Sequence, residues 1–299
     1  MIAGVLLLIF TGLCWTFVGA VLSYCTRNRI AVVTLLGPQS VLAVLIAFWF
    51  LPDYSLLRQG MPAGMPALVG VMLAAGLANG IGILVMQRAM SMGHHGMTWA
   101  IGQSALIMPF LAGLLIFHEP PTAWRLAGIG AILSSLILFG LAREHAEEGH
   151  SRKVPRTWFP LALTTLVILG VGQVLTTMPS YIPALTDTAR LRMPLFYLGN
   201  GAVIVALWHR QGGRPNRPTL TLAVIGVATN LISIFSLFRG LDLLAGYQML
   251  SLGYPIAVGS CITLFALYSA VVLREPFTRR HLAGMALGLT GIVLLSSGA

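Results

Sequence analysis

The chain has 299 residues, of which 57% are hydrophobic and only 9% are charged, and its mean hydropathy is +0.87. Soluble globular domains carry roughly a quarter charged residues, so this composition excludes an ordinary soluble fold and indicates a surface that mostly faces lipid. The formal net charge of +10 would suit a nucleic-acid partner, but the 18 basic residues are scattered among loops and helix ends, so no nucleic-acid binding is expected.

Ten long apolar runs follow one another along the chain. They fall at about 2–24, 30–51, 67–92, 96–117, 123–141, 157–181, 187–208, 219–241, 246–272 and 279–297. Each can cross roughly 30 Å of hydrocarbon as a helix, and uninterrupted runs exclude the alternating pattern of a barrel. The sequence therefore predicts an all-α membrane protein with ten transmembrane helices. Met1 to Tyr24 has no basic n-region or cleavage pattern, so we expect a helix there, not a signal peptide.

The cysteines and histidines predict no metal, cofactor or disulfide. Cys14, Cys25 and Cys261 are isolated, without CxxC spacing or a histidine pair at ligand spacing. Small apolar residues inside helices are the simpler interpretation. The pair His94-His95 lies in a predicted tight loop, where it adds polarity or forms a pH-sensitive gate.

The two halves of the chain repeat one another. The pattern E-P-x-T-x3-L-A-G begins at Glu119 and again at Glu275, an offset of 156 residues (275 − 119). Asn79 and Arg88 are echoed by Asn230 and Arg239 at an offset of 151, and the neighbourhood of Gln39 is echoed more loosely by that of Asn200. We therefore predict a five-helix repeat over 1–142, a charged linker over 143–156 and a second five-helix repeat over 157–299. Five is an odd number, so the second repeat is expected to be inverted, as in many secondary transporters.

The Glu119-Pro120 and Glu275-Pro276 turns, each before a glycine-containing final helix, resemble the drug/metabolite transporter superfamily in its EamA-like ten-helix form. That resemblance covers essentially the whole chain. It implies transport of small organic solutes, without ATP, through a central cavity between the repeats. A weaker likeness to rhamnose–proton symporters lies in the segments Leu84-Val85-Met86-Gln87-Arg88, Met90-Ser91-Met92-Gly93 and Ala100-Ile101-Gly102, and in the basic cluster directly after the first predicted helix.

The Glu-Pro turns have a structural explanation of their own. Proline disfavours helical geometry at the residue before it, so each turn ends a helix. Thr122 and Thr278 then follow at N-cap positions, and a glutamate favours a positive helix start. We therefore prefer a structural role for Glu119 and Glu275 over a transport role. Gly284 and Gly288 in the last predicted helix allow close packing, either between repeats or in a homodimer.

All acidic residues are predicted to lie in loops or at helix ends. They are Asp53, Glu119, Glu144, Glu147, Glu148, Asp187, Asp242 and Glu275. A carrier that exchanges protons for organic cations needs a buried carboxylate, so an organic-cation substrate and carboxylate-based proton or sodium coupling are not expected. The identity of any coupling ion stays open, because backbone carbonyls and neutral side chains also bind cations.

Neutral polar and aromatic residues inside the apolar runs are the candidate substrate contacts. They are Trp15, Gln39, Asn79, Trp99, Gln103, Gln173, Asn200, Asn230 and Tyr254. Amides both donate and accept hydrogen bonds, and aromatic faces stack on sugar rings. Each amide has a competing interpretation, namely a hydrogen bond to a neighbouring helix. Arg88 and Arg239 either bind an anion or extend to the membrane interface, and we favour the interface.

The predicted loops also indicate an orientation. Loops after odd-numbered helices hold thirteen basic residues and loops after even-numbered helices hold five. The positive-inside rule therefore predicts a multi-pass protein of the cell inner membrane with both termini outside. Many ten-helix relatives are drawn with both termini inside, so the count and the resemblance disagree on this point.

Together these features predict a secondary transporter of a small polar metabolite, with a neutral solute such as a sugar preferred. An exporter of amino acids or other small metabolites is the alternative. A membrane-embedded enzyme is a distant one, because no nucleophile–base set or paired acids lie in the spans. The absence of a Walker motif argues against ATP-driven transport by this chain alone.

Overall fold

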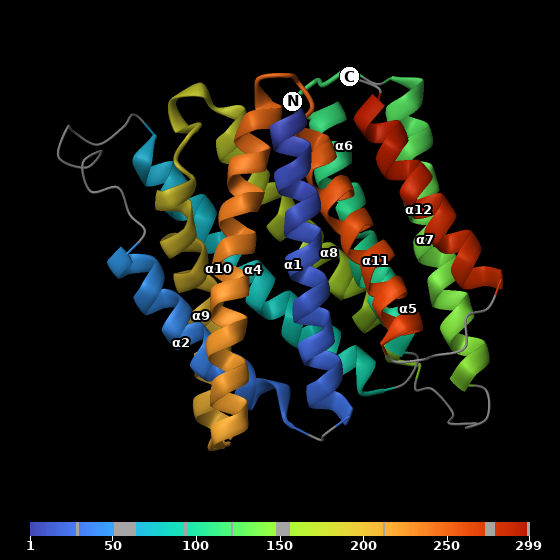
Figure 1. The fold of residues 1–299 in the computed structure, drawn as a ribbon. Helices are drawn as coiled ribbons and strands as arrows, with labels where there is room; N and C mark the ends of the chain where they lie inside the picture. Colours follow the sequence, from blue (N-terminus) through green and yellow to red (C-terminus); the bar gives the residue numbers. More distant parts are fainter. Residues whose placement is uncertain are drawn as a thin grey trace.

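The computed structural model describes residues 1–27, 30–50, 64–92, 95–120, 122–147, 156–211, 213–272 and 279–297 (Figure 1). Within these ranges every regular element is a helix. The α-helices are α1 (Ile2–Arg27), α2 (Val32–Phe50), α4 (Met65–Met90), α5 (His95–Gln103), α6 (Ile107–Leu115), α7 (Ala123–Glu147), α8 (Trp158–Thr177), α9 (Ala189–Gln211), α10 (Arg217–Ala245), α11 (Gly253–Val271) and α12 (Arg279–Ser297). The 3-10 helices are η1 (Ser104–Leu106), η2 (Met178–Tyr181), η3 (Pro183–Leu185) and η4 (Leu250–Leu252).

The helices coincide with the predicted apolar runs to within a few residues. Six helical segments, those of α1, α2, α4, α8 with η2, α9 and α10, are long and apolar enough to cross a membrane. Shorter apolar helical segments lie at 101–115, 123–138, 250–265 and 282–295. The chain is thus an all-helical, multi-pass membrane protein, and the count of ten spans stays a prediction.

Two predicted boundaries differ from the structure. The helix α7 continues to Glu147, so the first residues of the predicted linker at 143–156 are helical. The predicted span at 96–117 is not a single α-helix, because the 3-10 helix η1 separates α5 from α6. The start of α7 follows the expected chemistry, since the Thr122 hydroxyl accepts from the Arg125 N–H at 3.2 Å. The corresponding Thr278 lies outside the described residues, as do Glu275 and Pro276.

Helices from the two halves of the chain pack against each other in two groups. In the first, the α1 group, α1 packs along α10 and α11. In the second, the α4 group, α4 packs along α8 and α9, and α5 and α6 pack on α8. Glycine allows both close approaches, because a Cβ on Gly12 would collide with Ala257 of α11 and one on Gly76 with Phe196 of α9. The helix α2 contacts both α9 and α10.

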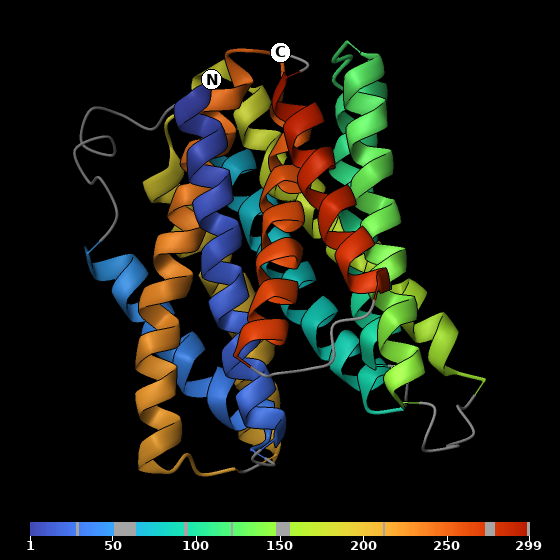
Figure 2. The same cartoon turned by 45° about the vertical axis from the view of Figure 1, so that its right-hand side comes forward.

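The helices α7 and α12 form a pair at the edge of the molecule (Figures 1 and 2). A Cβ on Gly128 would meet Leu295 and Gly291, and one on Gly288 would meet Thr263 and Ser135. The last predicted helix therefore uses Gly288 for packing within the chain. Figures 1 and 2 also show that α1 begins and α12 ends at the same side of the bundle, which we call the termini side. The α6–α7, α8–α9 and α10–α11 connections lie there too.

Candidate functional site

An aromatic and hydroxyl cluster connects three helices beneath the termini side. The ring of Trp15 on α1 lies 6.2 Å from that of Tyr254 on α11, measured between centroids. The Tyr254 and Thr176 hydroxyl oxygens are 2.6 Å apart, and Thr176 also donates to the Gln173 carbonyl at 2.7 Å. Since Thr176 has a single hydroxyl proton, Tyr254 donates to Thr176. The cluster joins the α1 group to the α4 group.

Gln173, three residues before Thr176 on α8, has an unused side-chain acceptor. Its Oε1 is buried and has no hydrogen-bond partner among the described residues. A buried acceptor without a partner costs free energy, so such an atom suggests a ligand or water that completes it. Three of the predicted site residues, Trp15, Gln173 and Tyr254, are thus brought into one region of the molecule.

Asn79 and Asn200 are brought together elsewhere. The Asn79 Nδ2 donates to the Asn200 Oδ1 at 3.2 Å, which connects α4 to α9 inside the α4 group. This bond supports the helix-joining interpretation of both amides. Gln39 of α2 is buried against Gly226 of α10. It is the polar member of a small pocket otherwise lined by Phe17, Val18, Val21, Leu35, Leu36 and Gly226.

The remaining predicted site residues lie apart from both amide sites. Trp99 and Gln103 are half-buried on α5, and Gln103 is its last residue before the η1 turn. Asn230 is half-buried on α10, where its backbone carbonyl accepts from the Ser233 hydroxyl at 2.8 Å. Trp99 and Gln103 thus belong to the α4 group, whereas Asn230 belongs to the α1 group.

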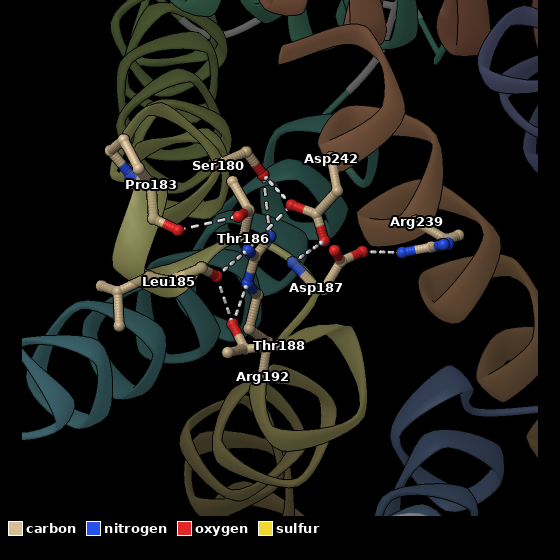
Figure 3. Close-up of polar contacts among 9 residues, drawn as sticks. All are labelled: Ser180, Pro183, Leu185, Thr186, Asp187, Thr188, Arg192, Arg239 and Asp242. Atoms are coloured by element: carbon tan, nitrogen blue, oxygen red, sulfur yellow. Dashed lines mark hydrogen bonds and ion pairs between the residues drawn. The ribbon is translucent and has the colours of Figure 1, made fainter. Parts of the chain in front are cut away.

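Figure 3 shows a buried ion pair that the sequence did not lead us to predict. Arg192 of α9 is fully buried, and its Nη2 lies 2.8 Å from the Oδ1 of Asp242 on α10. The guanidinium also donates to the Ser180 hydroxyl at 2.8 Å, the Thr188 hydroxyl at 3.0 Å and the Leu185 carbonyl at 2.6 Å. We call these residues the Arg192 cluster. Its members come from α9, α10 and the η2–η3 connection between α8 and α9.

Both oxygens of Asp242 are used within the Arg192 cluster. The Ser180 hydroxyl donates to Oδ1 at 2.7 Å and the Asp187 backbone N–H donates to Oδ2 at 3.2 Å (Figure 3). Asp187 itself binds Arg239 of α10 at the surface. Arg239 is therefore half-buried and paired with an acid, whereas its sequence counterpart Arg88 is exposed.

A second buried carboxylate belongs to Glu119, four residues after α6. It accepts from the Ser251 N–H at 3.1 Å, from the Ser251 hydroxyl and from the Tyr181 hydroxyl at 3.0 Å. The Arg125 Nη1 lies 4.0 Å away and donates to the Pro120 carbonyl at 2.9 Å. We call these residues the Glu119 cluster. Glu119 thus binds Ser251 in η4 and also lies beside Arg125 in the first turn of α7.

The expectation that no carboxylate is buried in the bundle is wrong. Glu119 is 5% exposed and Asp242 is 9% exposed, although both lie near helix ends as predicted. Sequence reasoning missed their partners Arg125 and Arg192, which it assigned to loops. An arginine inside the predicted apolar run at 187–208 was the available signal, because an intramembrane charge is costly and usually has a partner.

Comparison with known proteins identifies a protein of similar sequence and a solved structure of similar fold. The chain is 32% identical over 143 residues to the "Probable 4-amino-4-deoxy-L-arabinose-phosphoundecaprenol flippase subunit ArnE" of Pseudomonas aeruginosa (strain UCBPP-PA14), a match that covers 46% of this chain and 96% of that protein. A solved crystal structure of another protein superposes on 99% of this chain and 99% of its own, with a TM-score of 0.71 and 15% identity. No protein-family model matches the chain.

Proposed function

Because this chain belongs to the drug/metabolite transporter superfamily, we propose that it is a secondary transporter of a small, uncharged, polar solute such as a sugar. The observation that carries the proposal is the pairing of the buried charges. Glu119 lies beside Arg125 and Asp242 binds Arg192, so these four groups compensate one another. In the described part of the chain they are the buried charged residues, which leaves neutral groups for the substrate.

The Tyr254 cluster supplies suitable neutral groups. Trp15 and Tyr254 provide aromatic faces, and the Gln173 Oε1 provides an acceptor for a hydroxyl donor. A charged substrate would need a counter-charge inside the bundle, and the paired residues would have to separate to provide it. The solute would cross the membrane by alternating access, in which the α1 group rocks against the α4 group.

The predicted inverted repeat is part of this proposal, with repeats at 1–142 and 157–299. If the two repeats are matched helix by helix, α1 corresponds to α8 and α4 corresponds to α10. The α1–α10 pair is then equivalent to the α8–α4 pair, and both pairs are closely packed. The same matching relates α2 to α9 and α7 to α12, and the members of each of these pairs pack against each other. The curated relative, at about half the length of this chain, has the size expected for one repeat.

We propose the orientation that the basic residues predict, with both termini on the outer side of the inner membrane. Exposed arginines support it, because Arg88 near the end of α4, Arg210 near the end of α9 and Arg217 at the start of α10 are on helix ends that lie toward the side opposite the termini in Figure 1. At the termini side, Arg125 and Arg192 are buried and Arg239 is paired, while Arg190 at the start of α9 is exposed. Labelling of a cysteine placed at Asn216 in intact cells tests this, since labelling by an impermeant reagent from outside would contradict it.

A flippase for lipid-linked sugars is the second candidate. Its support is the name of the relative, together with the mostly apolar pocket around Gln39 between α1, α2 and α10. Such a substrate would place an alkyl chain against that pocket. A small soluble solute would not need it.

Thermal unfolding of the detergent-purified protein tests both candidates. A ligand at about 100 times its Kd should stabilise the protein by roughly 2.7 kcal/mol. We expect stabilisation by neutral sugars or polyols, and its loss in Q173L, while Q39L retains it. Stabilisation by polyprenyl-phosphate sugars that Q39L removes would favour the flippase. Stabilisation by organic cations alone would contradict the neutral-solute proposal.

A further inference from the structure

The short helix η2 is held from both sides by buried carboxylates. Its neighbouring residues Ser180 and Tyr181 donate to different acids, Ser180 to Asp242 and Tyr181 to Glu119. The Tyr181 ring also stacks on Phe117 with a centroid distance of 3.6 Å. One segment at the termini side is therefore a member of both the Arg192 cluster and the Glu119 cluster.

Both clusters cross between the two helix groups. Asp242 of α10 belongs to the α1 group and binds Arg192 of α9, which belongs to the α4 group. Ser251, in the η4 turn that leads into α11 of the α1 group, binds Glu119 at the end of α6 in the α4 group. By contrast, the Asn79–Asn200 and Thr16–Cys261 bonds each remain inside one group. Motion of one group against the other would break the two clusters and spare the bonds inside each group.

The backbone at this side is also strained. The described non-glycine residues with positive φ are His118 (54°), Asp187 (61°) and Gln248 (53°). One lies in each of the α6–α7, α8–α9 and α10–α11 connections, which all lie at the termini side. Such conformations cost free energy and persist only where the surroundings impose them. They are typical of segments that switch between arrangements.

We propose that the Glu119 and Arg192 clusters form a gate that closes the termini side of the transport path in this structure. The Tyr254 cluster lies directly beneath this gate, because Gln173, Thr176 and Ser180 follow one another along α8 and η2. Separation of the clusters admits solute from the termini side to the Gln173 acceptor. The gate rests on the alternating-access transport proposed above.

Thiol labelling tests the gate without a substrate. The three native cysteines are replaced by alanine, and Q173C is added as a reporter below the gate. An impermeant maleimide is applied from the termini side of oriented vesicles, and the labelling rate is measured. The gate variants are E119Q and R192Q/D242N, and S251A is a milder one that leaves every charge in place. The control is T98V, which removes the buried 2.7 Å bond from Trp158 inside the α4 group.

The gate predicts labelling that is slow in the parent and on the order of ten-fold faster in E119Q and R192Q/D242N. S251A should give a rise of about two- to five-fold and T98V none. Should E119Q or R192Q/D242N fail to fold, S251A alone decides the outcome. Unchanged labelling in every folded gate variant, or an equal rise in T98V, overturns the gate. Solute uptake is measured separately in the protein that retains Gln173. Faster labelling of the gate variants together with no uptake by that protein would leave the gate in place and contradict the proposed transport function.

Discussion

The Arg192 cluster and the Glu119 cluster both bind η2, yet their charges are compensated to different degrees. In the Arg192 cluster the ion pair is 2.8 Å long and the guanidinium makes further bonds to two hydroxyls and a carbonyl. In the Glu119 cluster the arginine is 4.0 Å from the carboxylate, and the Arg125 Nε has no partner among the described residues. From this difference in charge pairing we predict that the Glu119 cluster costs less free energy to separate than the Arg192 cluster.

The largest effect is expected from D242N, which leaves the fully buried Arg192 without its counter-charge. Breaking a buried pair in this way costs about 3–5 kcal/mol of unfolding free energy. Chemical denaturation in detergent measures that loss. The control R192M/D242L removes both charges and should recover at least half of it. A loss in D242N smaller than the loss in E119Q would reverse the ranking of the two clusters.

A smaller loss is expected from E119Q. The amide oxygen of glutamine still accepts from the Ser251 N–H, but the charge beside Arg125 disappears, so the cost should be about 1–3 kcal/mol. The same denaturation measurement checks it. As a matched comparison, S251A removes one donor and keeps the charge, and should cost about 0.5–1.5 kcal/mol. A cost for S251A above that of E119Q would show that packing, not charge, dominates this cluster.

Y254F probes the neutral contact between the same two helix groups. The phenyl ring keeps its contact with Trp15, while the Thr176 hydroxyl loses a donor and retains its bond to the Gln173 carbonyl. The expected cost in unfolding free energy is about 0.5–1.5 kcal/mol. T176V provides the reciprocal deletion. A cost that equals that of D242N would mean that the ion pair is not the stronger connection.

The smallest effect is expected from Q248G, and it is stabilising. Glycine adopts positive φ without steric cost, so relief at this position should add about 0.5–1 kcal/mol of unfolding free energy. Q248A keeps the strain and should leave stability within about 0.5 kcal/mol of the parent. Thermal unfolding of the three proteins in parallel measures the difference. Destabilisation by Q248G would show that the Gln248 side chain contributes more than its backbone strain costs.

The sequence predicted the helices well because apolar runs of membrane length specify them locally. It predicted Trp15, Gln173 and Tyr254 as candidates, since each is a polar or aromatic residue in such a run. It could not predict which amides meet, because the Asn79–Asn200 bond depends on how closely glycines allow α4 and α9 to approach. The burial of Glu119 and Asp242 was missed for a related reason. A carboxylate near a helix end is exposed or buried according to the loops that fold over it, and those contacts join residues far apart in sequence.

The interleaved packing of the two halves has a consequence for biosynthesis. The end of α1 at Arg27 and the start of α10 at Arg217, its main partner, are separated by 190 positions (217 − 27). Until α10 and α11 leave the ribosome, the glycine face of α1 around Gly12 must remain against lipid or an insertion factor. The helix α4 likewise lacks its main packing partners until α8 and α9 have been synthesised. A chain truncated at Glu147 would therefore insert its helices yet expose their close-packing faces, which makes it a substrate for membrane quality control.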